Sequence, residues 1–243
     1  MTLTALGLAI AMGFGMGLLG GGGSIVAVPA LTFLLHFPPK DAVATSLAVV
    51  GLAAAAGALG GFVRGVLPLT IAITVGLSAT VGAVAGGAAG ARLSDQTQLT
   101  MLSIVMFGAA VAMWRPRPLE RSAPRRRLPF LIVLGLAIGA LTGLVGVGGG
   151  FLIVPALVLF TDLPLAKAAA ASLFVITLSA LAALPNYAGR TSLSWTFIVP
   201  FALAAGVAAI AGGMVAHRLP QRRLQQAFAV TLVLLASYVF TQA

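Results

Sequence analysis

Two stretches of the chain read almost alike: residues Gly17–Leu31 are GLLGGGGSIVAVPAL, and residues Gly143–Leu157 are GLVGVGGGFLIVPAL. Nine of the fifteen positions are identical. Both stretches put a dense glycine cluster inside an apolar run, where an unsatisfied backbone group costs several kcal/mol in lipid. Irregular backbone persists at membrane depth only where protein buries it or a polar cavity wets it. The pair therefore predicts two interrupted membrane segments with a special role.

The composition places the chain in a membrane. Of its 243 residues, 60% are hydrophobic and 7% are charged, whereas soluble domains carry about 25% charged residues. A spanning helix needs about 20 apolar residues, and the chain has long apolar runs without the alternation of a β-barrel. We expect an all-α polytopic membrane protein with apolar runs at Thr2–Leu35, Ala42–Val63, Leu67–Ala91, Thr97–Trp114, Leu128–Phe160, Ala166–Ala188, Leu193–Ala216 and Leu224–Phe240.

The net charge of +10 does not indicate a nucleic-acid partner. The basic residues lie between the apolar runs, where the positive-inside rule expects them. The chain has no cysteine, which excludes disulfides, thiolate metal sites and cysteine nucleophiles. His36 and His217 have no second ligand nearby in sequence, so we predict no metal site and no cofactor.

The two glycine stretches belong to a longer duplication. A shift of 126 residues aligns the halves without a gap, and it matches ATSL at 44–47 with AASL at 170–173 and Arg64 with Arg190. Chance similarity of apolar segments does not explain matched Gly, Pro, Ser and Arg residues in one register. We expect a first repeat at 1–114, an Arg-rich linker at 115–127 and a second repeat at 128–243.

The first apolar run is too long for a simple span. As one helix, Thr2–Leu35 would measure about 51 Å, against a hydrocarbon core of about 30 Å. It either crosses once as a kinked span or breaks at the glycines and returns to the same side.

Charge counting favours the re-entrant alternative. If both broken runs return, eleven of the fourteen basic residues share the linker's side, whereas single spans divide them eight to six. Each half then has three full crossings, so the repeats are inverted, a recurring plan of secondary transporters. We expect the linker to be cytoplasmic in a cell inner membrane, with both termini outside.

The glycine breaks suit a small anion. Glycine permits unusual φ values, and a helix that begins after each break would present N–H groups and its positive dipole end. Hydroxyls of the ATSL and AASL motifs would add side-chain contacts, although hydroxyls in membrane helices usually bond to the backbone of their own or a neighbouring helix. We predict substrate-binding residues Gly21, Gly22, Gly23, Ser24, Thr45, Ser46, Gly148, Gly149, Gly150 and Ser172, and a portal at Asn186 and Tyr187.

Other small or basic residues have simpler expected roles. Glycines at four-residue spacing are typical of close helix packing in membranes. Repeated arginines near helix ends are expected to snorkel to the interface. The glycine stripes are Gly13/Gly17, Gly82/Gly86/Gly90 and Gly135/Gly139/Gly143, and the arginine pairs are Arg64/Arg190 and Arg92/Arg218.

The chain resembles the sulfite exporter TauE/SafE family of membrane proteins over essentially its whole length. The resemblance rests on GGGGSIVAVPAL and GVGGGFLIVPAL, on ATSL and AASL, and on AGGAAGARL and AGGMVAHRL. It implies transport of sulfur-containing anions such as sulfite, thiosulfate, sulfoacetate or related sulfonates.

We therefore expect a transporter of small sulfur-containing anions that works by alternating access and is not an enzyme. An anion channel that uses the same site as a selectivity filter is the alternative. An intramembrane enzyme is disfavoured because no metal cluster, Cys nucleophile or paired carboxylates stand at membrane depth. The exact substrate, the transport direction, the coupling ion and the oligomeric state stay open at this stage.

Overall fold

The computed structural model describes residues 3–21, 27, 30–90, 95–114, 128–145, 150–161, 163–184 and 193–242. These residues form helices and the turns between them, with no strand among them. The linker at 115–127 lies outside the described residues. The prediction of an all-α protein is confirmed.

The helices follow the apolar runs closely. Each half begins with one helix that ends at a glycine cluster, continues with a short helical segment, and then has three longer helices. The elements are α1 (Leu3–Leu19), the π-helical turn η2 (Ala30–Leu34), α3 (Pro39–Val63), α4 (Leu69–Gly90), α5 (Asp95–Trp114), α6 (Leu128–Val145), α7 (Gly150–Thr161), α8 (Leu165–Ala183), α10 (Trp195–Arg218) and α11 (Gln221–Gln242).

Matching helices of the two halves begin 126 residues apart. Leu69 and Trp195 begin α4 and α10, and Asp95 and Gln221 begin α5 and α11. Pro38 and Pro164 stand directly before α3 and α8, with φ of −53° and −54°. Proline supplies this φ without strain and has no N–H to leave unsatisfied at a helix start.

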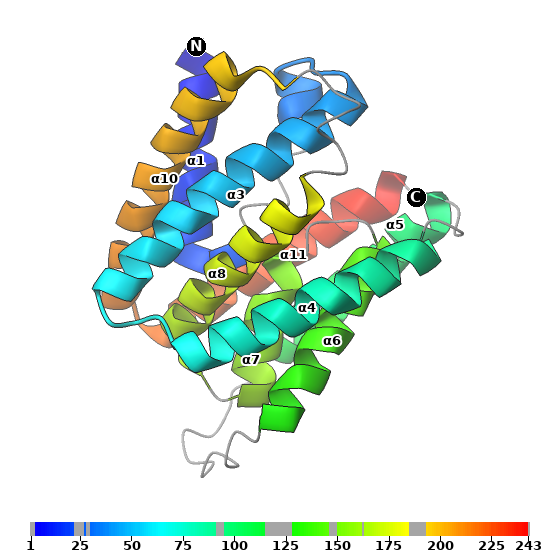
Figure 1. Ribbon diagram of the computed structural model, residues 1–243, viewed down its shortest axis with the longest axis vertical. Coiled ribbons are helices and arrows are strands. Elements are labelled where there is room, and N and C mark those ends of the chain that lie inside the picture. Colours follow the sequence, from blue (N-terminus) through cyan, green and yellow to red (C-terminus); the bar gives the residue numbers. More distant parts are fainter. Residues whose placement is uncertain are drawn as a thin grey trace.

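The first helix of each half packs on the other half. Gly13 and Gly17 of α1 lie against the backbone of Ala205 and Ala209 of α10, so these helices run parallel. The second half mirrors this arrangement, because α6 packs on α4 (Figure 1). Gly139 of α6 lies against Ala79 of α4. These residues are the repeat equivalents of Gly13 and Ala205, which are in contact in the other pair of helices. The glycine stripes therefore pack helices, as predicted, and they join the halves.

Two further pairs bring matching helices together. Figure 1 shows α5 beside α11 and α3 alongside α8, and both pairs are in contact. Along α3, Gly51 contacts Ala180 while Gly61 contacts Ala170. The numbers rise in one helix as they fall in the other, so α3 and α8 are antiparallel.

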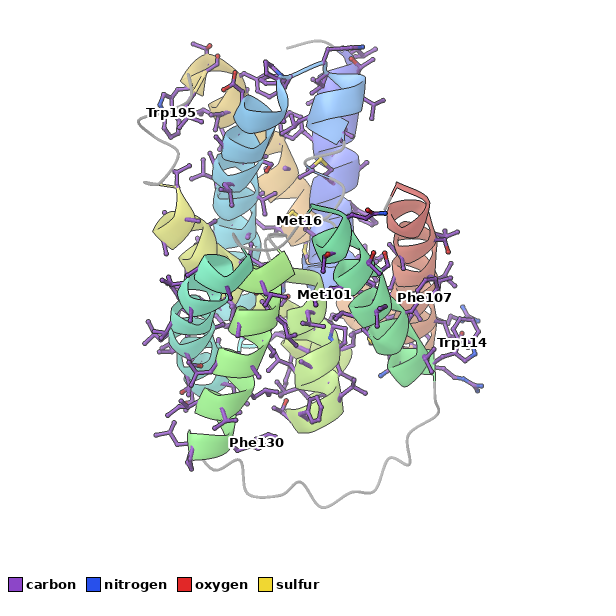
Figure 2. The ribbon with its side chains drawn as sticks, turned by 90° about the vertical axis from the view of Figure 1, so that its right-hand side faces the viewer. Met16, Met101, Phe107, Trp114, Phe130 and Trp195 are labelled. Carbon is purple, nitrogen blue, oxygen red and sulfur yellow. The ribbon has the colours of Figure 1, made fainter. Side chains whose placement is uncertain are left out.

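The outer surface is apolar, as a bilayer requires. Four described helices are long and apolar enough to cross a membrane. Phe107 and Trp114 of α5 and Trp195 of α10 point away from the bundle (Figure 2) and are 37%, 58% and 52% exposed. Aromatic side chains of this kind are enriched where membrane proteins meet lipid and interfacial water. The four helices contain Ala44–Val63, Leu69–Gly86, Leu165–Ala183 and Trp195–Arg218.

Candidate functional site

The first glycine cluster ends α1, as the sequence predicts. The α-helix stops at Leu19, and Gly20 adopts a φ of +73°. An L-residue pays about 1–2 kcal/mol for left-handed backbone, so glycine is the residue that this turn requires. In the second half, α6 stops at Val145, directly before the second cluster. Both expected interruptions are therefore present at the described helix ends.

The break of the first half is held by a serine of the second half. The backbone N–H of Gly21 donates to Oγ of Ser172 at 3.2 Å, across 151 residues of sequence. The Ser172 hydroxyl in turn donates to the carbonyl oxygen of Ala169 at 2.8 Å. Ser172 is fully buried on α8. A buried N–H without an acceptor costs about 1–3 kcal/mol, so this serine satisfies the broken backbone at the junction of the halves.

The break is also tightly enclosed by α7 and α8. A methyl group built on Gly20 would lie 2.6 Å from Oγ of Ser172 and 2.7 Å from Cγ2 of Val154. It would also lie 2.9 Å from Cα of Ala169, a backbone atom that cannot rotate away. Gly20 is therefore required twice, once by its φ and once by its neighbours.

The structure brings together only part of the predicted binding set. Gly21 and Ser172 are in direct contact, and Thr45 and Ser46 are buried on α3 at 2% and 5% exposure. Gly150 is the first residue of α7. The remaining predicted site and portal residues lie outside the described residues, and these are Gly22, Gly23, Ser24, Gly148, Gly149, Asn186 and Tyr187.

Several described hydroxyls bond to the backbone of their own helix. Ser78 donates to Thr74 O at 2.7 Å, and Thr177 donates to Leu173 O at 2.9 Å. Ser172 differs because its oxygen also accepts a bond from a distant segment. The expectation that such hydroxyls bond backbone is thus met even at the predicted site.

A second polar feature lies between α1, α3, α8 and α10. It is a pocket of about 340 Å³ including its open mouth. Arg64 and His217 are its ionisable lining residues. Its apolar lining comes mostly from glycine and alanine residues of the four helices, with Leu173 of α8 and Val66 after α3. The lining residues are Gly17, Gly57, Arg64, Val66, Ala166, Ala170, Leu173, Ala209, Gly213, Ala216 and His217.

The end of α3 fixes Arg64 at this pocket. Gly65 has a φ of +66°, and the N–H of Val66 donates to Gly61 O at 2.9 Å, which closes the helix as a left-handed glycine cap does. The guanidinium then reaches α10, because Nη2 lies 2.8 Å from a methyl built on Gly213. From the sequence, Arg64 is expected to snorkel and His217 has no expected role, because their 153-residue separation hides the pocket.

Comparison with known proteins identifies the family. The model of the family described as sulfite exporter TauE/SafE matches residues 5–239. The chain belongs to the sulfite exporter TauE/SafE family. Two proteins described as probable membrane transporter proteins, from Xylella fastidiosa strains Temecula1 and 9a5c, are each 29% identical to the chain over 236 residues. Each match covers 94% of this chain and 90% of the relative.

No solved structure gives a significant match to the chain. The TauE/SafE family model and the Xylella relatives nevertheless describe one class of protein, and the apolar helices agree with it. The chain is accordingly a multi-pass membrane protein of a transporter family.

Proposed function

We propose that this TauE/SafE protein transports small sulfur-containing anions, such as sulfite, thiosulfate and small sulfonates, across the cell inner membrane. The anion would bind at the glycine-rich breaks between two inverted repeats, which would expose it to each side in turn. The family description supports the substrate class. The observation that carries the site is the hydrogen bond from Gly21 N–H of the first half to Ser172 of the second.

That bond marks a backbone donor that an anion can use. Gly21 N–H points at a hydroxyl oxygen 3.2 Å away, and an oxyanion is a stronger acceptor than a hydroxyl. An anion that took the place of Ser172 Oγ would loosen the contact between the halves. Binding and movement of the two halves would thereby be coupled through one hydrogen bond.

The basic pocket supports the re-entrant topology. If the broken runs crossed the membrane once, Arg64 would lie on the opposite side from Lys167 and Arg218. In the structure Arg64 shares a pocket with Ala166, the sequence neighbour of Lys167, and with His217, the sequence neighbour of Arg218. All three basic residues then lie near one end of the bundle, in agreement with the eleven-to-three charge count.

The antiparallel contact of α3 with α8 supports inversion of the repeats. A two-fold axis along the membrane normal would leave equivalent helices parallel. The contacts of Gly51 with Ala180 and of Gly61 with Ala170 run in opposite order. They agree with an axis in the membrane plane, as in transporters that work by alternating access.

Cysteine labelling tests the topology. Ser122→Cys, in the linker, should resist a membrane-impermeant maleimide in intact cells, whereas a cysteine added after Ala243 should react. The chain has no native cysteine, so the labels report these positions alone. Equal labelling of both from outside contradicts the proposed orientation.

Counterflow in proteoliposomes tests the function. Vesicles loaded with unlabelled thiosulfate should accumulate labelled thiosulfate from outside, at a rate that saturates as its concentration rises. Vesicles loaded with sulfite or a small sulfonate in place of thiosulfate should also accumulate the label. Large single-channel currents with the same anions would instead identify an anion channel. Absence of both with every tested anion contradicts the proposal.

A substitution in the break tests the site. Gly21→Val should abolish thiosulfate binding, because a branched side chain beside the N–H blocks the approach of the anion. Gly108→Val is the matched control, since nothing lies within 4 Å of a methyl built there. Thiosulfate affinity and melting temperature are measured on the same purified samples. If folded Gly21→Val protein binds thiosulfate with unchanged affinity, the anion does not bind at the break.

A further inference from the structure

Arg64 and His217 form a basic pair that the glycine site does not use. Both side chains are exposed, and both line the pocket between α1, α3, α8 and α10. Among the described residues, none forms an ion pair with the Arg64 guanidinium. A guanidinium at the mouth of a pocket attracts anions, and its planar fork of donors fits the oxygens of an oxyanion.

The shape of the pocket is adapted to this guanidinium. A methyl built on Gly213 would lie 2.8 Å from Nη2 of Arg64, and one built on Gly60 would lie 3.3 Å from Nη1. Any larger residue at Gly213 would push the guanidinium away from α10. Glycine at these two positions leaves room for Arg64 to lie between α3 and α10.

The pocket runs from this basic mouth toward the glycine break. Its lining includes Gly17 of α1, three residues before Gly20, and Ala170 and Leu173 of α8. Ala170 and Leu173 are the chain neighbours of Ala169 and Ser172, which contact the break. The whole pocket has room for only about one water molecule, so it is nearly closed in this conformation.

We propose that the Arg64–His217 pocket is the loading vestibule on the linker side, where a small oxyanion is captured before it reaches the glycine break. The inference rests on the proposed function and adds an entrance to it. Arg64 supplies charge and a bidentate donor. His217 supplies a further ring donor, and the first turn of α8, at Ala166, adds its positive dipole end.

An anionic lipid headgroup offers the same chemistry as a free oxyanion. Basic pockets between membrane helices on the cytoplasmic side bind phosphate headgroups in other proteins. The vestibule proposal commits to the free anion, because the pocket leads inward to Gly17 and the break. The lipid composition of the test vesicles distinguishes the two sources.

Thiosulfate counterflow with Arg64 variants tests the vestibule. In vesicles of phosphatidylcholine alone, Arg64→Gln should raise the KM about tenfold, in the range of electrostatic steering effects, and leave kcat within about twofold. Raising the ionic strength from about 0.02 M to 0.5 M should shrink the difference, because salt screens the charge. Arg64→Lys should restore part of the affinity. Arg222→Gln, which removes an exposed charge of α11 outside the pocket, should match the wild type.

Several outcomes overturn the vestibule. The proposal is wrong if folded Arg64→Gln has the same KM as Arg222→Gln. It is also wrong if Arg64→Gln raises the KM only in vesicles that contain an anionic lipid. His217→Gln gives a second test if Arg64→Gln is unstable, and it should raise the KM about threefold by loss of one donor. Failure of the wild-type protein to move any tested anion overturns the proposed function as well, whereas an unchanged KM in both variants overturns the vestibule alone.

Discussion

Glycines of the helix stripes and glycines of the break look alike in sequence but meet different demands. Gly13, Gly17 and Gly86 lie in regular helices, and a methyl group on any of them would overlap a carbonyl oxygen of the facing helix. Gly20 lies where a helix stops, at a φ of +73°, against side chains of α7 and α8. The stripe glycines thus allow two helices to pack closely, whereas Gly20 allows the backbone to adopt a positive φ.

The difference shows how the chain builds a site in an apolar bundle. Close approach of α1 to α10 and of α4 to α6 joins the halves through glycine and alanine residues. Membrane helices gain little from hydrophobic burial and rely on such packing. The polar contact from Gly21 to Ser172 can then be reserved for the break. Four substitutions test this division, from the largest expected loss of stability to the smallest.

Gly86→Val should have the largest effect. The new side chain would overlap the backbone of Ala140 on α6, and neither helix backbone can yield without separating the pair. We expect the stability of the folded protein to fall by at least about 3 kcal/mol. The loss should appear as a lower melting temperature and a smaller monodisperse peak in size-exclusion chromatography in detergent. Gly108→Val on α5, with open space around it, should stay within about 0.5 kcal/mol of the wild type. Equal losses in both would show that the stripe is not close-packed.

Gly20→Ala should cost about 2–3 kcal/mol, because alanine pays for positive φ and its methyl meets Ser172 and Ala169. Melting temperatures of purified variants measure the loss. In a Ser172→Ala background the same change should cost about 1 kcal/mol less, since one of the crowding atoms is gone. Strict additivity of the two changes would mean that the break relaxes away from α8.

Ser172→Ala should cost about 1–2 kcal/mol, because the buried hydrogen bond from Gly21 N–H to the serine hydroxyl is lost. Ser179→Ala on the same helix is the matched control. Its hydroxyl donates only to Ile176 O, one turn back, at 3.0 Å. The control should be close to neutral in the same melting experiment. If Ser179→Ala lowers the melting temperature as much as Ser172→Ala, the bond between Gly21 and Ser172 contributes no more to stability than an ordinary hydroxyl bond within a helix.

Gly65→Ala should be the mildest of the four, at about 1 kcal/mol. Gly65 has almost the same φ as Gly20, +66°, but nothing lies within 4 Å of a methyl built on it. The change therefore measures the cost of positive φ alone. Subtracting it from the Gly20→Ala loss gives the contribution of the enclosed surroundings. Identical melting temperatures for the two variants would show that this contribution is negligible.

The sequence predicted the helices well because apolar length, glycine and proline act locally. The expected run Leu67–Ala91 corresponds to α4 at Leu69–Gly90, and Thr97–Trp114 corresponds to α5 at Asp95–Trp114. The breaks at the two glycine clusters were predicted for the same reason, since consecutive glycines in an apolar run disfavour a continuous helix. The 126-residue duplication predicted that both halves share one plan.

What the sequence by itself determined, then, is the class of protein, the helices, their interruptions and the stripes that allow close packing. Only the tertiary structure decided that α1 packs on α10, that Ser172 holds Gly21, and that Arg64 and His217 share a pocket. In a soluble helix an apolar stripe reveals the buried face, but a membrane helix is apolar toward lipid and protein alike. The partner of each face is therefore set by contacts between residues far apart in the sequence, such as Gly13 with Ala205 and Gly21 with Ser172, which no local pattern records.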